Sequence, residues 1–301
     1  MTADTPVEKF PEFLPPAAKT LTEDASVAMA KQMHQAFVQT DLSDRPIATP
    51  YVCEGNGTPP ILLLHGFDSS LLEFRRLVPH LASFRQTWAV DLLGFGLGDR
   101  TDINTLTPED IKHHLYCFWE QNIQQPIVLV GASMGGAAAI DFALTYPNLV
   151  NRLVLLDSAG FAAGPAMGRF MFPPLDRWAT GFLKSSGVRR RISLQAYHDK
   201  SFVTSDAEMC ASLHLDCPRW AESLIAFTKS GGYNFLSQKI EHIAMPTLVV
   251  WGKQDKILGT QDATKFEAKI PDAILVWIDQ CGHVPHLEKP EETAAAIQSW
   301  L

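Results

Sequence analysis

The amino-acid sequence predicts an α/β fold in which helices cover both faces of a mostly parallel central sheet. Apolar runs that end in turns have the composition of strands buried on both faces. They span 60–67, 87–96, 126–131, 152–160, 246–252 and 273–282. Helical patterns lie between these runs, over 71–84, 107–124, 134–146, 260–269 and 290–301. Strands that alternate with helices along a chain indicate a parallel sheet.

The alternation stops between about 161 and 242, where there are helical patterns but no strand-like runs. We expect residues 161–242 to form a helical cap, and residues 47–160 and 243–301 to form the α/β core. Such an insertion would lie over the C-terminal ends of the strands, where open α/β sheets bind ligands. Residues 1–46 should form a tail and a helix over 23–38. The helix is indicated by residues at helical spacing, namely Val27, Ala30, Met33, His34 and Phe37.

The composition suits a protein with a sizeable core, because 46% of the 301 residues are hydrophobic and 19% are charged. That length fits one large α/β domain or two ordinary ones. The formal net charge is −8, and the basic triplet 189–191 stands alone. A nucleic-acid partner is therefore not expected.

Signals for secretion, metal binding and membrane insertion are weak. The first residues lack the basic and apolar regions of a signal peptide. The five cysteines form no CxxC pair, which favours reduced thiols in a cytoplasmic protein and argues against a zinc site. The apolar stretch 126–144 is interrupted by Ser133, Asp141 and three glycines, which fits a strand joined to a helix. We expect no cofactor, no metal and no stable membrane insertion, and the oligomeric state stays open.

Ser133 is the candidate nucleophile. Residues 131–135 read GASMG and match the pattern G-x-S-x-G, directly after a predicted strand and directly before an alanine-rich helix. The motif requires this context, because the serine sits on a sharp strand-to-helix turn. Side chains at the two flanking positions would collide, which explains Gly131 and Gly135. The alternative is a serine with a purely structural role in the turn.

A serine hydroxyl becomes a good nucleophile only when a base removes its proton. The candidate base is His283, in the loop after the last predicted strand, and Asp255 is the candidate acid that orients it. Asp157, which follows the strand after the nucleophile helix, is the alternative acid. The backbone N–H groups of Phe67 and Met134 are the candidate donors to the oxyanion of a tetrahedral intermediate.

Five landmarks in order carry a resemblance to a known family: HGF (65–67), DLLGFG (91–96), GASMGG (131–136), WGKQD (251–255) and GHVPHLEKP (282–290). From about residue 47 to the C-terminus, the sequence resembles the α/β-hydrolase fold superfamily, in which the triad follows the order Ser, Asp, His. Residues 65–76 and 88–96 resemble little-characterised hydrolases of photosynthetic lineages.

Departures from subfamily patterns narrow the implied chemistry. Haloalkane dehalogenases and epoxide hydrolases of this fold use an aspartate nucleophile, and here the nucleophile is Ser133. Carbon–carbon bond hydrolases are similar at 131–144, but they usually have a glycine-rich oxyanion loop and an aromatic residue after the catalytic histidine. This chain has HGFD and Val284 at those places. Cofactor-free haloperoxidases or perhydrolases often share a serine followed by methionine, and they also act as esterases.

We therefore expect a serine hydrolase that acts on a small to medium apolar carboxylic ester through an acyl-enzyme. The alternatives are a carbon–carbon bond hydrolase for a vinylogous diketone, a perhydrolase-like activity, and a non-enzymatic ligand-binding member of the fold. Aromatic residues of the 161–242 segment should line the pocket, and Trp220 and Tyr233 are the candidate substrate contacts.

Overall fold

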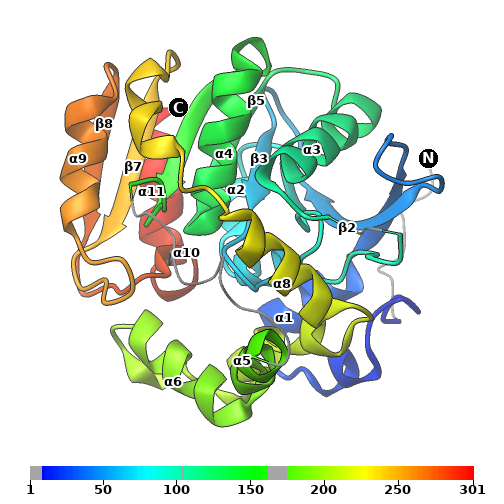
Figure 1. The fold of residues 1–301 in the computed structure, drawn as a ribbon. Helices are drawn as coiled ribbons and strands as arrows, with labels where there is room; N and C mark the ends of the chain where they lie inside the picture. The colour runs from blue at the N-terminus through cyan, green and yellow to red at the C-terminus, as the bar shows by residue number, and fades with distance from the viewer. Residues whose placement is uncertain (1–8, 103–104, 162–174) are drawn as a thin grey trace, which may run out of the picture.

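The computed structural model describes residues 9–102, 105–161 and 175–301. It has a central eight-stranded sheet with helices on both faces (Figure 1). The strands are β1 (His34–Val38), β2 (Ile47–Glu54), β3 (Ile61–Leu64), β4 (Thr87–Val90), β5 (Ile127–Ala132), β6 (Val150–Leu156), β7 (Thr247–Gly252) and β8 (Ala273–Ile278). They lie in the order β1-β2-β4-β3-β5-β6-β7-β8. β2 pairs antiparallel with β1 and β4, and every other pairing is parallel.

The helices of the core alternate with these strands as the sequence predicts. They are α1 (Asp24–Lys31), α2 (Val78–Ala82), α3 (Pro108–Asn122), α4 (Met134–Thr145), α9 (Gln261–Lys269), α10 (Pro285–Glu288) and α11 (Pro290–Trp300). Short 3₁₀ helices are η1 (Pro16–Thr20), η2 (Leu71–Phe74) and η3 (Pro147–Leu149). The mostly parallel α/β architecture is thereby confirmed.

Both faces of the sheet are buried, which explains why the strands read as continuous apolar runs. In β3, Leu62 and Leu64 belong to the core shared with α3, α4 and α9, whereas Ile61 and Leu63 belong to the core shared with α1, α2 and α11. Successive side chains of a strand point to opposite faces, so two cores require an apolar residue at every position.

The prediction of one helix over 23–38 is wrong in its second half. α1 ends at Lys31, and His34–Val38 is the edge strand β1, which pairs with β2. The segment carries apolar residues at both helical and alternating spacing, and pairing with β2 decides between the two. Phe37 is 66% exposed on this edge strand, so it is not a core residue.

Two other elements differ from the prediction. The predicted strands do not include β2, which has Pro50 near its middle, although proline disfavours a central strand. Its carbonyl nevertheless accepts the Asp91 N–H, at 3.0 Å, where β2 runs beside β4. The helix expected over 71–84 is instead η2 followed by α2, and Pro79 lies in the first turn of α2.

A helical segment lies between β6 and β7, as the interrupted alternation predicts. Its elements are α5 (Leu175–Lys184), α6 (Ser186–Ala196), η5 (Lys200–Phe202), α7 (Ser205–Cys210), η6 (Leu213–Asp216), α8 (Trp220–Ser230), η7 (Leu236–Gln238) and η8 (Ile240–His242). In Figure 1 most of it lies beyond one end of the sheet. Across the described ranges, no helix combines the length and apolarity that crossing a membrane requires.

Candidate active site

Ser133 occupies a strained turn between β5 and α4. Its φ is 52° and its ψ is −118°, a conformation that side-chain-bearing residues rarely adopt. A β-carbon at Gly131 would lie 2.3 Å from the Gly135 carbonyl oxygen, and one at Gly135 would lie 2.0 Å from the Leu64 carbonyl oxygen. Only glycine fits at both places. The turn therefore holds the serine at the first residue before a helix, where negative charge is stabilised.

His283 and Asp255 form a buried hydrogen-bonded pair. The His283 Nδ1 lies 3.0 Å from Asp255 Oδ2, and the two residues are 7% and 6% exposed. Asp255 Oδ1 accepts the N–H groups of Ile257 at 2.7 Å and Leu258 at 3.2 Å, which fixes the carboxylate. An oriented acid of this kind holds an imidazole in one tautomer, with Nε2 free to accept a proton.

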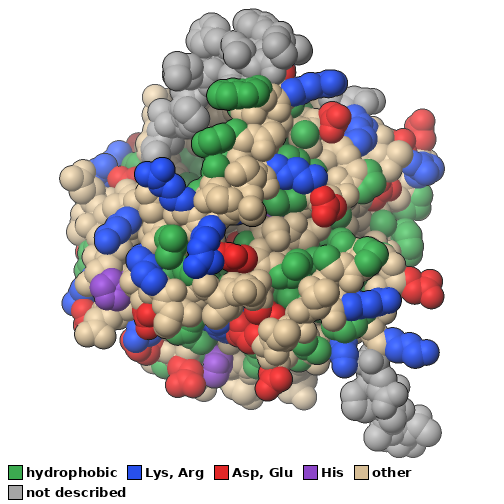
Figure 2. Space-filling model, turned by 90° about the horizontal axis from the view of Figure 1, so that it is seen from below, with side chains coloured by type: hydrophobic (Ala, Val, Ile, Leu, Met, Phe, Trp, Pro, Cys, Tyr) green, Lys and Arg blue, Asp and Glu red, His purple; other side chains and the backbone are tan. Residues whose placement is uncertain are grey.

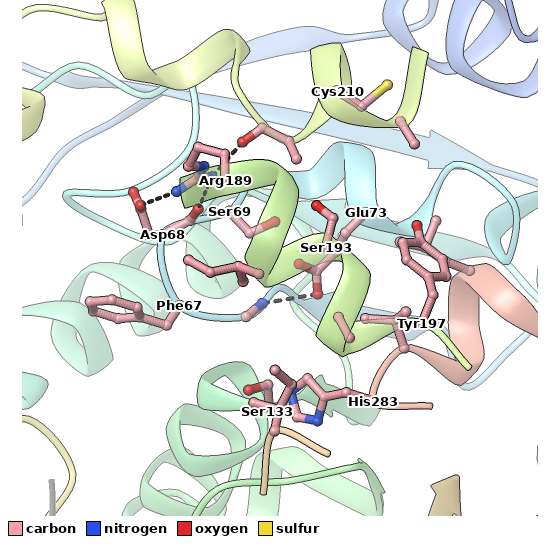
Figure 3. A pocket seen from close by; sticks show the side chains of 18 of the residues that line it. Phe67, Asp68, Ser69, Glu73, Ser133, Arg189, Ser193, Tyr197, Cys210 and His283 are labelled. Atoms are coloured by element: carbon pink, nitrogen blue, oxygen red, sulfur yellow. Dashed lines mark hydrogen bonds and ion pairs between the residues drawn. The ribbon is translucent and has the colours of Figure 1, made fainter. Parts of the chain in front are cut away.

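Ser133 and His283 line the same cavity, and Figure 3 shows them beside one another. No hydrogen bond joins these two described residues in the structure. Contacts between nucleophile and base are often long in unliganded enzymes and shorten when substrate binds. The candidate nucleophile Ser133 therefore shares its cavity with an imidazole that Asp255 orients.

Asp157, the alternative acid, lies behind this pair. It is fully buried after β6, and its Oδ1 accepts the Gly252 N–H at 3.0 Å. Burial and the nearby Asp255 carboxylate raise the pKa of Asp157 well above its usual range, so the neutral acid is favoured. Asp255, not Asp157, accepts the hydrogen bond of the His283 Nδ1, and a neutral Asp157 could not stabilise an imidazolium as a carboxylate would.

Asp157, Asp255 and His283 also lie close enough to hold a metal ion, since their ligand atoms are within 4.8 Å of one another. Two features fit metal binding poorly. The Nδ1 of His283 is already bonded to Asp255. The raised pKa of Asp157 favours a protonated carboxyl, which is a weak ligand.

One candidate oxyanion donor begins a helix and the other lies in a loop. Met134 is the first residue of α4, and Phe67 follows β3 in the loop that also lines the cavity. Neither amide donates a hydrogen bond to any described residue. The neighbouring Gly66 N–H, in contrast, donates to Glu73 Oε1 at 2.9 Å. Among the described residues both amides thus lack an acceptor, and Phe67 lines the cavity whereas Met134 follows the lining residue Ser133.

The cavity has a volume of about 300 Å³ and a largely apolar lining. The core contributes Gly66, Phe67, Ser133, His283 and Val284, and the helical segment contributes Leu183, Ile192, Ala196 and Tyr197. Its volume lies at the lower end of the range for small-molecule pockets. Outside it, the face of the molecule that carries α5 and α6 mixes hydrophobic side chains with Lys and Arg (Figure 2).

Trp220 and Tyr233 do not line this cavity, contrary to the sequence expectation. Trp220 is 6% exposed, and its indole N–H donates to Asp68 at 2.7 Å. Tyr233 is buried against Phe227, with 5.9 Å between the ring centroids. Both aromatic side chains pack between the helical segment and the core, because that junction has its own apolar interior to fill.

Several polar residues that line the cavity were not predicted as site residues, namely Glu73, Arg75, Arg189 and His286. Burial raises the pKa of Glu73 to about 7, although hydrogen bonds from Ser69 and Gly66 oppose the shift. A glutamate inside the apolar run 71–74 was the available signal. A periodic pattern alone does not reveal that such a residue faces a cavity.

Comparison with known proteins agrees with this geometry. The model of the alpha/beta hydrolase family matches residues 61–296. The alpha/beta hydrolase domain-containing protein VTE7 of Arabidopsis thaliana is 30% identical, over 97% of this chain and 90% of its own. The 2-hydroxy-6-oxo-6-(2'-aminophenyl)hexa-2,4-dienoic acid hydrolase of Metapseudomonas resinovorans is 28% identical, over 91% of this chain and 94% of its own.

A solved structure shows the same likeness. The serine hydrolase CarC, involved in carbazole degradation, is 27% identical and superposes with a TM-score of 0.73, covering 89% of this chain and 98% of its own. The family model spans the sheet from β3, the serine turn and the His283 loop. The chain belongs to the alpha/beta hydrolase family.

Proposed function

We propose that this protein is a carboxylic ester hydrolase that works through a Ser133 acyl-enzyme. The observation that carries the proposal is the shared cavity of Ser133 and His283, in which His283 is held by Asp255 at 3.0 Å. Nucleophile, base and orienting acid are the parts that acyl transfer requires.

Each step uses groups already in place. The Ser133 hydroxyl attacks the ester carbonyl carbon while the Nε2 of His283 accepts its proton. The Phe67 and Met134 amides donate to the oxyanion of the tetrahedral intermediate. His283 then protonates the leaving alcohol, and the carbonyl re-forms as the acyl-enzyme. Water attacks this ester by the same route, giving the carboxylic acid and regenerating the serine.

The substrate class follows from the cavity. Leu183 and Ile192 line it beside the catalytic groups, and an apolar lining of about 300 Å³ favours a small to medium apolar ester. In this proposal residues 161–242 act as the cap whose helices shape the pocket. The active protein needs no metal or cofactor for these steps.

A carbon–carbon bond hydrolase is the second candidate. It is favoured by the 28% identity to the Metapseudomonas resinovorans dienoic acid hydrolase. Such an enzyme would use the same three residues on a vinylogous diketone. Against it stands the oxyanion loop HGFD, without the glycine-rich sequence usual in those enzymes, and Val284 after the histidine.

The test is a panel of p-nitrophenyl esters of graded acyl length, measured beside a vinylogous diketone. Wild type should hydrolyse the esters with the higher kcat/KM and should react covalently with a fluorophosphonate probe. Ser133→Ala should do neither, whereas Ser299→Ala, which changes an exposed serine of α11, should behave as wild type. Faster turnover of the diketone would favour the second candidate. Labelling of Ser133→Ala at the wild-type rate would exclude Ser133 as the nucleophile.

A further inference from the structure

Asp68 directly follows the candidate oxyanion residue Phe67 and is buried, with 6% of its surface exposed. Its Oδ1 accepts hydrogen bonds from Trp220 Nε1 at 2.7 Å and from His214 Nε2 at 3.0 Å. Its Oδ2 forms an ion pair with Arg189, which Figure 3 shows beside the cavity. The Asp68 carboxylate therefore accepts hydrogen bonds from three side chains.

These donors come from three separate elements of the helical segment. Arg189 lies on α6, His214 on η6 and Trp220 on α8. Arg189 also donates to the Asp68 carbonyl oxygen at 3.2 Å and to the Ala211 carbonyl oxygen. Hydrogen bonds to Asp68 thus connect the loop after β3 to the segment between β6 and β7.

The charges at this point are balanced. Burial alone would raise the pKa of Asp68, but His214 and Arg189 together hold it below its usual value. Burial lowers the pKa of His214, which favours a neutral ring that donates from Nε2. One buried carboxylate thus faces one guanidinium, and removing the carboxylate would leave three donors without their acceptor.

The Phe67 amide lies between two anchors. On one side, the Gly66 N–H is held by Glu73 at 2.9 Å. On the other side, Asp68 is held by the helical segment through its carboxylate and its carbonyl. Asp68 has a φ of 50°, so the backbone there is in the left-handed region that few side chains favour. Contacts made by the Asp68 side chain offset that strain.

We propose that Asp68 is a positioning residue that couples the helical segment to the oxyanion donor of Phe67. The donor is correctly aimed when α6, η6 and α8 are docked on the Asp68 carboxylate, and it moves away when they are not. The proposal rests on the proposed function, because it assumes that the Phe67 amide stabilises an oxyanion.

The sharpest variant is Trp220→Phe, because it removes one N–H donor and keeps an aromatic ring. Trp220 does not line the cavity, so it would not touch a bound substrate, and its indole N–H donates to Asp68. Removing one oxyanion donor costs about 10²–10³ in kcat. We expect Trp220→Phe to lower kcat roughly 3- to 10-fold and Asp68→Asn roughly 10- to 100-fold, with KM within about 3-fold.

A matched control breaks a different carboxylate ion pair of the same segment. Asp176 is 2% exposed on α5 and binds Lys229 of α8 at 2.8 Å, and neither residue lines the cavity. Asp176→Asn should lower Tm and leave kcat unchanged. Turnover of a p-nitrophenyl ester, fluorophosphonate labelling rate and Tm are measured for every variant.

A double-mutant cycle separates coupling from general damage. If Trp220 acts through Asp68, adding Trp220→Phe to Asp68→Asn lowers kcat no further. Independent, multiplying losses, or a wild-type kcat in Trp220→Phe, would overturn the coupling. Should Asp68→Asn fail to fold, the single variant Trp220→Phe decides by its kcat and KM. Absence of turnover and labelling in wild type would instead overturn the proposed function itself.

Discussion

One pair of substitutions, Asp255→Asn and Asp157→Asn, shows which of the two carboxyl groups near His283 acts as its orienting acid. Asp255 Oδ1 accepts two backbone N–H groups at 2.7 and 3.2 Å. These donors will keep the carbonyl oxygen of an asparagine on their side, so its NH₂ group will face the Nδ1 of His283. An N–H donor there forces the proton of the imidazole onto Nε2, where it blocks acceptance of the serine proton.

Asp255→Asn should lower kcat strongly. The equivalent change of tautomer in a serine protease triad lowers kcat by about 10⁴. Four decades in rate correspond to roughly 5 kcal/mol of transition-state stabilisation at 25 °C. Asp157→Asn should stay within about 3-fold of wild type, because a neutral acid is replaced by a neutral group of the same shape. Its carbonyl can still accept the Gly252 N–H, which lies 3.0 Å away in the wild type.

The assay is steady-state hydrolysis of a p-nitrophenyl ester at pH 8, with Tm measured for both variants. A further check is the fluorophosphonate labelling rate, which should fall in parallel with kcat. The reasoning is refuted if Asp157→Asn loses three decades or more while Asp255→Asn remains active. Equal losses in both variants would show that the two carboxyl groups act as one unit.

Three further outcomes are expected. Burial raises the pKa of Glu73 from 4.5 to about 7, so its stabilising contribution is complete below pH 4.5 and is lost as pH rises through 7. Urea unfolding between pH 4.5 and 7 should therefore show the free energy of unfolding of wild type falling by on the order of 3 kcal/mol relative to that of Glu73→Gln. A difference between the two proteins that does not change with pH would contradict the raised pKa. Gly135→Ala would place a β-carbon 2.0 Å from the Leu64 carbonyl oxygen, whereas Gly181→Ala has open space around it. Gly135→Ala should lower the free energy of unfolding in urea by about 3 kcal/mol or more, or fail to fold, and Gly181→Ala should keep wild-type stability. Phe118 is fully buried, and Phe118→Ala should lower the free energy of unfolding by about 3–5 kcal/mol; a loss under 1 kcal/mol would show that the site is not packed.

Local patterns in the sequence were enough for the α/β core and for the serine turn. Each parallel strand is buried on both faces, so its apolar run is visible without knowledge of its neighbours. The turn at Ser133 is equally local, because Gly131 and Gly135 meet steric limits set by adjacent residues and by β3. The candidate triad residues could also be placed in loops at the ends of strands, because each of them follows a predicted strand.

Contacts between distant segments could not be read in this way. Pairing with β2 made a strand of 34–38, where helical spacing suggested a helix. The choice between Asp157 and Asp255 depended on which carboxylate reaches His283. In the sequence, Trp220 is one aromatic residue among several in an insertion. In the structure, its indole N–H donates to Asp68, 152 positions earlier in the chain. Such partners are fixed by the packing of the helical segment on the core, since no local periodicity encodes which buried donor meets which acceptor.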